Sequence, residues 1–587
     1  MKQYVFRNWW RYVIGAICLL ISTALDIWFP LITMSIVDDV IVGGNLEMLW
    51  PNLIFILICG FGRAISQYVK EFLFDMAGCR VAEGMRRDLM GHMYKLSKSF
   101  FKRNNTGELM ARVKDDTGKI WDITGFAGML IIEASCYLIG VVVCMFFLEW
   151  RLALIPLAFL PILGFFVMWL EKRLDGLYGE ISEENASLTR VIEENISGVR
   201  TVKAFSAEAF EISKFDERNE KYNELNIKQA KFMAVAEPVI SLIPRVMQAL
   251  VLLIGGYSAI THGISYGVLV AFMQYASNIV WPIENMGWLL NILSSAIASR
   301  KKLMKIFREM PEIAQKEDAA VLPDNKGALE FCDVSFKIDD TEILSHVSFC
   351  LENGKTLGIM GATGTGKSTV VNLIERFYDV TSGQILIGGV DIRDLTLKSV
   401  RDYSSVVTQD IFLFSDTIKE NVKLGKKSTM GDDNVRYALK KAHASEFVEK
   451  ITGGYDAVIG ERGIGLSGGQ KQRLSIARAL AKPAGVLIMD DSTSALDMET
   501  ESDIQKEIAS KKDMSKIIIG HRISSVKDAD EIIVLDGGHI AERGTHEQLM
   551  SAKGLYYSTY EAQYGNYKEA LRVVKGGEGH GDECFEG

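Results

Sequence analysis

A glycine-rich stretch in the second half of the chain carries the residue types that bind phosphate groups. Glycines let the backbone fold tightly around phosphate oxygens with its amides pointing inward, Lys367 reaches the β- and γ-phosphates, and Ser368 can hold Mg²⁺. An apolar strand is expected over 355–360 and a helix over 369–377, which is the context that such a loop requires. The residues expected to contact the nucleotide here are Gly361, Ala362, Thr363, Gly364, Thr365, Gly366, Lys367, Ser368 and Thr369.

Further short segments follow this loop in a fixed order: Gln409, Leu466–Gln470, Val486–Asp491 and His521. The apolar run 486–489 predicts a strand that delivers Asp490 to the carboxyl end of a parallel sheet, beside the loop. A carboxylate at that place is suited to hold Mg²⁺, through water in most such sites. Asp491 comes next. The segment 466–470 opens a predicted helix, so its amides can face an anionic phosphate.

In this order the motifs resemble the nucleotide-binding domain of ABC transporters, with ATP and Mg²⁺ as the implied cofactors. The resemblance implies that Gln409 reaches the metal and that His521 contacts the γ-phosphate. It implies that Asp497 lies in the D-loop, at a seam between two domains packed head to tail. The signature segment completes the site of the other domain, so one chain builds only part of each site. This segment consists of Leu466, Ser467, Gly468, Gly469 and Gln470.

Two positions depart from the family pattern. Members usually stack an aromatic residue on adenine where this chain has Ile338, which gives apolar contact without stacking. They usually carry a glutamate where this chain has Asp491. A base one methylene shorter is displaced by about 1 Å, and such an error costs on the order of 10²-fold in rate. Asp491 is therefore expected to be a slow base, or to work after a slight rearrangement, and ATP binding is expected in either case.

The N-terminal half is apolar enough for a membrane protein. The chain has 587 residues, 48% of them hydrophobic, and a net charge of −9, so nucleic acid is not an expected partner. Several stretches approach the ~20 residues that cross a bilayer, and the first is too long for the apolar region of a signal peptide. The six expected spans are Tyr12–Val37, Leu49–Phe74, Phe126–Leu148, Leu152–Leu170, Val239–Thr261 and Tyr266–Leu290.

Charge and loop length predict how these spans are oriented. The connections at about 75–125 and 171–238 are long and basic, whereas the others are short and nearly free of Lys and Arg. The positive-inside rule therefore predicts a multi-pass protein of the cell membrane with both termini cytoplasmic. Each long connection reads as two helical arms of about 25 residues, which reach about 37 Å beyond the bilayer. The segments Phe100–Arg112 and Gly198–Glu208 resemble the intracellular loops of ABC exporters, where a short transverse helix docks on a nucleotide-binding domain.

The expected fold is an α-helical membrane domain of six transmembrane helices, followed by an α/β P-loop domain. We expect the membrane domain at 1–305, a linker at 306–328, the nucleotide-binding domain at 329–565 and a flexible tail at 566–587. This order resembles an ABC exporter half-transporter and implies ATP-driven outward movement of lipophilic or amphipathic small molecules, drug-like or lipid, by alternating access. Alternatives are a peptide or lipid exporter, or an ATP-sensing subunit that regulates a membrane complex without net transport.

Three acids fall within the apolar spans, where ionisable residues are costly and often functional. Asp26, Glu133 and Glu284 would suit a cationic lipophilic substrate, or they pair with Arg63, Arg245 or the backbone.

The intact signature segment beside an Asp491 base resembles one subunit of the heterodimeric bacterial multidrug ABC exporters. The implied partner is a second, different half-transporter whose own catalytic residue is a glutamate. Lipid bilayer and a small lipophilic substrate are the other implied partners.

Overall fold

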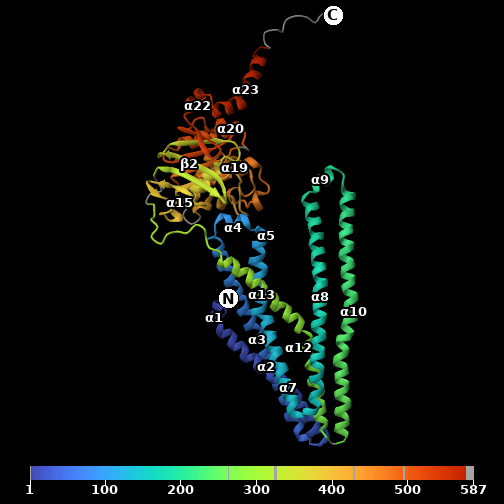
Figure 1. The fold of residues 1–587 in the computed structure, drawn as a ribbon. Helices are drawn as coiled ribbons and strands as arrows, with labels where there is room; N and C mark the ends of the chain where they lie inside the picture. Colours follow the sequence, from blue (N-terminus) through green and yellow to red (C-terminus); the bar gives the residue numbers. More distant parts are fainter. Residues whose placement is uncertain (1, 262, 323–326, 427–429, 494–495, 577–587) are drawn as a thin grey trace, which may run out of the picture. The chain divides into compact units, whose positions relative to one another are not determined.

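The structure is a computed structural model that describes residues 2–261, 263–322, 327–426, 430–493 and 496–576. The chain divides into two compact units, which are described separately (Figure 1). Residues 1–95 and 103–310 form the first unit, and residues 96–102 and 311–587 form the second. The second unit therefore includes a short piece, 96–102, from within the first long basic connection.

The first unit is entirely helical in its described residues. Its elements are α1 Lys2–Arg7, α2 Trp9–Ser35, the π-helix η1 Ile36–Val42, η2 Leu46–Met48, α3 Leu49–Met93, α5 Thr106–Ala111, η3 Arg112–Asp116, α6 Thr117–Thr124, α7 Phe126–Leu148, α8 Trp150–Ser197, α9 Val199–Ala204, α10 Glu208–Ile260, α11 Tyr266–Asn278, α12 Val280–Glu284 and α13 Met286–Arg308. Helix α4, Lys98–Arg103, crosses from one unit to the other.

Helices that are long and apolar enough to cross a membrane account for the first five predicted spans. Helix α7 has the predicted bounds, Phe126–Leu148, and Glu149 then caps α8 by accepting a hydrogen bond from the Arg151 amide. The sixth predicted span is broken into α11, α12 and α13, with interruptions at Ile279 and Asn285. Pro282 lies between these breaks and has no N–H to donate, which explains why a continuous helix does not form there.

The two long basic connections are helical extensions of the spans, as predicted. Helix α8 runs without interruption from the membrane segment to Ser197, and α10 returns beside it from Glu208 (Figure 1). The short helix α9 joins them at the tip. The 27 residues of α8 from Glu171 onward span about 40 Å, close to the expected reach.

The second unit contains two sheets. The six-stranded sheet has the order β10-β9-β3-β8-β7-β6, and the four-stranded antiparallel sheet has the order β2-β1-β4-β5. Their strands are β1 Leu329–Ile338, β2 Thr341–Leu351, β3 Thr356–Gly361, β4 Ser382–Ile387, β5 Val390–Asp391, β6 Ser404–Val407, β7 Val486–Asp490, β8 Ser515–Ile519, β9 Glu531–Asp536 and β10 His539–Gly544.

Helices surround these sheets and complete two apolar cores. One core joins the two sheets to α14, and the other lies under α17 and α19. The helices are α14 Lys367–Ile374, α15 Leu397–Tyr403, α16 Ile418–Val422, η4 Lys423–Lys426, α17 Asp432–Lys441, α18 Ser445–Lys450, η5 Gly454–Asp456, η6 Glu461–Gly463, α19 Gly468–Ala481, α20 Met498–Ser510, α21 Ile523–Val526, α22 His546–Ala552 and α23 Leu555–Gly576.

The predicted linker, 306–328, is mostly bound to its neighbours. Residues 306–308 end α13, and the structure's division into units falls after Met310. Residues 314–320 are hydrogen-bonded to the rest of the second unit. The Ala320 amide donates to the Asp394 carbonyl, and the Ala320 carbonyl accepts from the Thr396 amide. Residues 323–326 lie outside the described residues. Residues 566–576 of the predicted flexible tail continue α23, and 577–587 lie outside the described residues, so the flexible tail stays a prediction.

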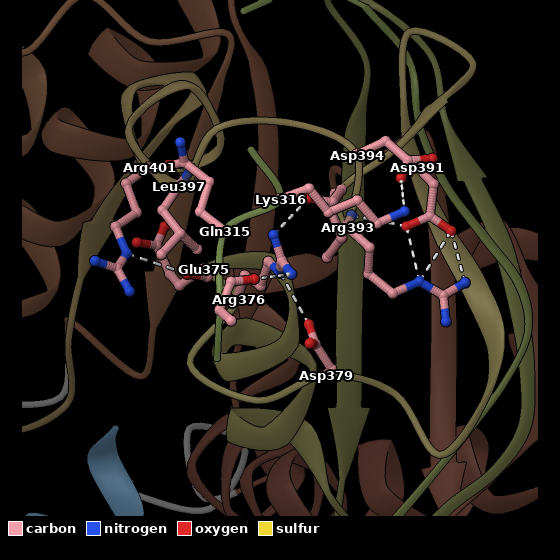
Figure 2. A network of polar contacts seen from close by, with 12 residues as sticks. Gln315, Lys316, Glu375, Arg376, Asp379, Asp391, Arg393, Asp394, Leu397 and Arg401 are labelled. Atoms are coloured by element: carbon pink, nitrogen blue, oxygen red, sulfur yellow. Dashed lines mark hydrogen bonds and ion pairs between the residues drawn. The ribbon is translucent and has the colours of Figure 1, made fainter. Parts of the chain in front are cut away.

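Arg376 fastens this segment to the second unit (Figure 2). Its buried guanidinium donates to Asp379 at 2.9 Å, to the Ile392 carbonyl at 3.1 Å and to the Ala314 carbonyl at 3.3 Å. Beside it, Lys316 pairs with Asp394. Arg376 follows the end of α14 with a left-handed backbone, φ 49°, where glycine is the usual residue. The chain therefore keeps a strained backbone in order to place this guanidinium.

Replacing Arg376 by glycine separates the two effects. Glycine relieves the left-handed strain, worth about 1 kcal/mol, but removes three hydrogen bonds at a buried site, worth about 2–4 kcal/mol. We expect Arg376→Gly to lower the melting temperature of the full chain and to speed tryptic cleavage after Lys316. A melting temperature above that of the wild type would show that the guanidinium contacts are not what holds this segment.

Candidate functional site

Four parallel strands, β3, β8, β7 and β6, end at one edge of the six-stranded sheet. Ile519 on β8 pairs with Ile359 on β3 and with Asp490 on β7, so the three chains leave the sheet at the same level. Beyond this edge come the glycine-rich loop, Asp491, Gly520-His521 and, after β6, Gln409. The sheet register thus brings together segments that are up to 160 residues apart in sequence.

The glycine-rich loop has the backbone that its composition predicted. Gly361, Gly364 and Gly366 all have positive φ, of 153°, 88° and 96°. A Cβ at Gly361 would lie 2.3 Å from the Leu535 carbonyl oxygen, so only glycine fits there. Gly366 caps α14, which begins at Lys367. The loop amides therefore lie at the positive end of a helix, a suitable place for phosphate.

Lys367 is held by its own loop. Its buried ammonium donates to the carbonyls of Gly361, at 2.8 Å, and Ala362, at 2.7 Å. Burial lowers the pKa of Lys367, while Asp490 and Asp491 act in the opposite direction. A bound phosphate would replace these neutral acceptors by charged ones, and hydrogen bonds to charged groups are the stronger kind. Thr365 is buried and bonds to Ala362 within the loop, whereas Thr363 is exposed and Thr369 half-buried.

Asp490 and Ser368 have the chemistry of a Mg²⁺ site. The Asp490 carboxylate is buried and hydrogen-bonded to the Ser368 hydroxyl. Burial is the main cause of its raised pKa, Asp491 adds to it, and Lys367 and His521 counteract it. A bound divalent cation would offset this desolvation, and carboxylate and hydroxyl oxygens are the ligands that Mg²⁺ prefers. The pair therefore fits the metal.

Asp491 is half-buried and lies beside the ammonium of Lys367. Its amide donates to the Ile519 carbonyl at 2.9 Å, and its backbone is left-handed, φ 44°. Aspartate tolerates this conformation better than most residues. Its side chain lines a cavity of about 1140 Å³ together with Asp497 and His521. The structure thus brings the predicted base, switch and D-loop residues to one cavity.

The loop that carries His521 is held by a residue that the motifs did not reveal. Gln563, on α23, donates to the His521 carbonyl at 2.6 Å and accepts from the Ile523 amide at 3.0 Å. Both bonds go to backbone atoms, so no pattern around Gln563 in the sequence signals this role. The C-terminal helix α23 therefore fixes the backbone on either side of Arg522.

Gln409 lies two residues past β6 with an exposed side chain. It is at the predicted edge, next to β7 in the sheet, and is free to turn toward a metal. Ile338 ends β1 and packs on the core beneath the four-stranded sheet. Asp497 is exposed and caps α20, because it accepts from the Thr500 amide at 3.0 Å, and this bond is the main cause of its lowered pKa.

The signature segment opens α19 as predicted. Ser467 and Gln470 form a reciprocal capping box, with the Gln470 amide donating to the Ser467 hydroxyl and the Ser467 amide donating to the Gln470 side chain. The Ser-x-x-Gln spacing in the sequence is typical of this kind of cap. Ser467 and Gly468 are exposed, Gly469 is half-buried, and Leu466 packs on the core under α19. In the described residues, no hydrogen bond or ion pair joins 466–470 to the glycine-rich loop.

Two of the three acids predicted for a substrate cavity are ion-paired. Asp26 Oδ1 lies 2.6 Å from Arg63 Nε, and Glu133 pairs with the fully buried Lys70. Arg63 was among the expected partners, whereas Lys70 was missed. Glu284 is exposed at the end of α12, beside the break in the sixth span, and no ion pair is given for it among the described residues.

The loop geometry predicts the effect of removing the ammonium. We expect Lys367→Ala to lower nucleotide affinity by about 10- to 100-fold, since hydrogen bonds to charged groups contribute about 1.5–3 kcal/mol each. Photolabelling of the full chain with an azido-ATP measures this. Lys355→Ala is the matched control, because Lys355 precedes the opposite end of β3 and pairs with Asp530. Equal labelling of both variants would exclude the loop as the phosphate site.

Comparisons with known proteins place both units in one family. A family profile described as "ABC transporter transmembrane region" matches residues 12–283, and one described as "ABC transporter" matches residues 344–494. A solved structure of a bacterial Atm1-family ABC exporter with ATP bound has a TM-score of 0.78 and 26% identity. That likeness covers 95% of this chain and 98% of the other.

Curated relatives match over nearly the whole chain. An ATP-dependent lipid A-core flippase of Syntrophus aciditrophicus is 34% identical, over 96% of this chain and 94% of the relative. A Staphylococcus aureus protein named for multidrug export is 33% identical, over 96% and 98%. YknU, an uncharacterized ABC transporter ATP-binding protein of Bacillus subtilis, is 34% identical, over 97% of each. The chain therefore belongs to the ABC transporter family, as an exporter half-transporter in which a transmembrane region is fused to a nucleotide-binding domain.

Proposed function

We propose that this chain is one subunit of an ATP-driven exporter that moves lipophilic or amphipathic small molecules, drug-like or lipid, outward across the cell membrane. The observation that carries this proposal is the meeting of Lys367, Asp490, Asp491 and His521 at one sheet edge, on a chain that also supplies membrane-spanning helices. The spans lie in the membrane with both termini cytoplasmic.

ATP and Mg²⁺ are the cofactors. The loop 361–369 would hold the phosphates, and Ser368 and Asp490 would hold the metal, with Gln409 as a further ligand. Lys367 leaves the two loop carbonyls and takes up the phosphate charge. His521, fixed by Gln563, contacts the terminal phosphate, and Asp491 accepts the proton of the attacking water. Magnesium supplies charge neutralisation for the phosphates.

A second half-transporter completes the ATP sites. Ser467 and Gln470 are already used to cap α19, which leaves the amides of Gly468 and Gly469 at an exposed helix end. These amides serve the site of another domain. The short base Asp491 makes this chain's own site slow, so the partner is a different chain with a catalytic glutamate. In that heterodimer one site turns over ATP and the other mainly holds it.

Closure of the nucleotide-binding domains reaches the membrane through the transverse helices. Residues 96–102 belong to the second unit, where Lys98 donates to Asn372 on α14 at 2.9 Å and lies 5.3 Å from the Phe377 ring centroid. This contact links the first basic connection directly to the helix of the phosphate loop. The tip around α9 exposes Phe205 and Phe210, each by more than two thirds, and is suited to dock on the partner.

The substrate is amphipathic and need not be cationic. Asp26 and Glu133 are compensated by Arg63 and Lys70, so the membrane unit does not present the three free acids that the sequence suggested. Glu284, at the helix break, is the acid that remains available for a polar group of the substrate. The relatives named for lipid A-core flipping and for multidrug export support amphipathic substrates of either kind.

An ATP-sensing subunit without net transport is the second candidate, and Asp491 is the observation that favours it. Vesicle uptake of an amphipathic dye decides between the two. Uptake that requires hydrolysable ATP indicates a pump, whereas a response to ATP held unhydrolysed indicates a sensor.

If one ATP site of the pair is fast and the other slow, two substitutions should have unequal effects on ATP hydrolysis. In the co-purified pair, Ser467→Ala should abolish most steady-state ATP hydrolysis, because it disturbs the helix start whose Gly468 and Gly469 amides face the partner's competent site. Asp491→Asn should cost less than about twofold, because its site is already slow. Ser467→Ala also removes a helix cap worth about 1 kcal/mol.

A matched control isolates that structural loss. Thr545→Ala removes the same kind of capping box, formed by Thr545 and Gln548 at the start of α22, and should leave hydrolysis unchanged. The heterodimer proposal is wrong if Asp491→Asn is as damaging as Ser467→Ala, or if the chain is fully active without another subunit.

A further inference from the structure

A basic cavity of about 280 Å³ lies within the first unit, between α1 and the extension of α3 beyond the second span. The cavity has four arginines and one glutamate in its wall, which leaves three positive charges in excess. Its lining residues are Tyr4, Arg7, Asn8, Trp10, Arg11, Arg80, Glu83, Gly84 and Arg87. The volume is just below the 300–1,000 Å³ of drug-sized pockets, which suits a headgroup better than a whole lipid.

Packing fixes the wall of this cavity. The Tyr4 hydroxyl donates to Asp88 at 2.6 Å, and burial together with Asp88 raises the pKa of Tyr4 to about 12, so the phenol stays a neutral donor. Gly84 permits the close contact, since a Cβ there would lie 3.1 Å from the Tyr4 ring. Asn8 is buried and donates to the Tyr4 carbonyl. The short helix α1 is therefore held against α3 by specific contacts.

The arginines of the cavity are incompletely satisfied within the chain. Arg80 and Arg87 both pair with Glu83, with nitrogen–oxygen distances of 3.2 Å and 2.6 Å. All three side chains are about half exposed or more. Exposed pairs of this kind contribute little, so an anionic ligand can displace them. Arg11 bonds to Asn8 through one nitrogen, but its buried Nε has no hydrogen-bond partner in the described residues. This Nε is packed against neighbouring atoms, so an anion in the cavity would be bound by the outer nitrogens of the guanidinium.

The cavity begins at the level of lipid headgroups and extends beyond it along α3. The Tyr12 ring, at the start of the first span, meets the Phe74 ring, at the end of the second, with centroids 5.6 Å apart. These rings mark the cytoplasmic edge of the hydrocarbon layer. Arg11 precedes Tyr12 directly and so falls within a headgroup layer of roughly 6 Å, whereas Arg80 lies about 9 Å beyond Phe74 along α3, just outside that layer. Trp10, 45% exposed, is typical of that layer.

We propose that this cavity binds the phosphate headgroup of an anionic phospholipid of the cytoplasmic leaflet. Arg11 and Arg80 hold the phosphate, and Arg7 and Arg87 add charge at the rim. The shared chemistry is that of a phosphate anion, and the depth of the cavity and the exposed Trp10 assign it to a lipid and not to a soluble phosphate. The site is separate from the transport cycle proposed above and does not depend on it.

The test compares lipid binding to the full chain by native mass spectrometry. Phosphatidylglycerol and phosphatidylcholine are titrated separately, and phosphatidylglycerol is titrated again with millimolar inorganic phosphate present. We expect a clear preference for phosphatidylglycerol that inorganic phosphate does not remove. Each guanidinium near the surface contributes about fivefold. The double variant Arg11→Gln/Arg80→Gln should therefore weaken the first phosphatidylglycerol by about 25-fold and leave phosphatidylcholine unchanged.

Two variants make the result decisive. Arg173→Gln removes an exposed arginine at the cytoplasmic end of another span, outside the cavity, and should change nothing. Arg11→Lys/Arg80→Lys keeps the charge and should retain binding within about threefold, which separates the site from a folding defect. Unchanged phosphatidylglycerol binding by the glutamine variant would overturn the proposal. Displacement of the lipid by millimolar phosphate would overturn its assignment to a lipid.

Discussion

The register of four parallel strands is the constraint on which the ATP site depends. Asp490 lies opposite Ile519, and Ile519 lies opposite Ile359, so the loops after β7, β8 and β3 begin at one level. All five residues of β7 are buried, which fixes this register through apolar packing on both faces. A slip of one residue would turn Asp490 to the other face of the sheet and separate it from Ser368 and Lys367.

We propose that the edge so formed is one half of a working site. Lys367 donates to two carbonyls of its own loop, so a phosphate has only neutral acceptors to displace. The amides at the start of α19 have no acceptor in this loop, and the side chains that frame them are tied into a capping box. The Lys367 ammonium and the start of α19 each have hydrogen-bond partners nearby in the sequence, and each can still contact a ligand or a second domain. These features support our proposal that the chain binds ATP by itself and completes its chemistry in a pair.

Local sequence was sufficient where one pattern alone determines the structure. Helix α7 has its predicted bounds because Gly125 and Glu149 flank a run in which Glu133 is the one charged residue, and β7 was found from its apolar residues ahead of Asp490. The sixth span carried its signal in Pro282, although the exact breaks did not follow from it. The motif residues 361–368 adopt the positive φ angles that their glycines indicated.

Long-range contacts account for what the sequence did not predict. Lys70 pairs with Glu133 across two helices, so no local pattern indicated that this acid is neutralised. Gln563 bonds only to backbone atoms of the His521 loop, 40 residues away. Arg376 occupies a left-handed position that composition would assign to glycine, because its guanidinium binds a segment some 60 residues earlier. The roles of these residues depend on contacts with distant parts of the chain, and such contacts produce no periodicity or spacing in the sequence.

The central claim is that one chain holds an ATP-binding edge but not a complete hydrolytic site. The most direct measurement reconstitutes the full chain in nanodiscs that hold either one copy or the pair with its partner subunit, and records ATP binding and hydrolysis in each. The account predicts that single-chain discs bind ATP without hydrolysing it, and that hydrolysis appears only in discs that hold the pair. Sustained hydrolysis by single-chain discs at the rate of the pair would contradict it.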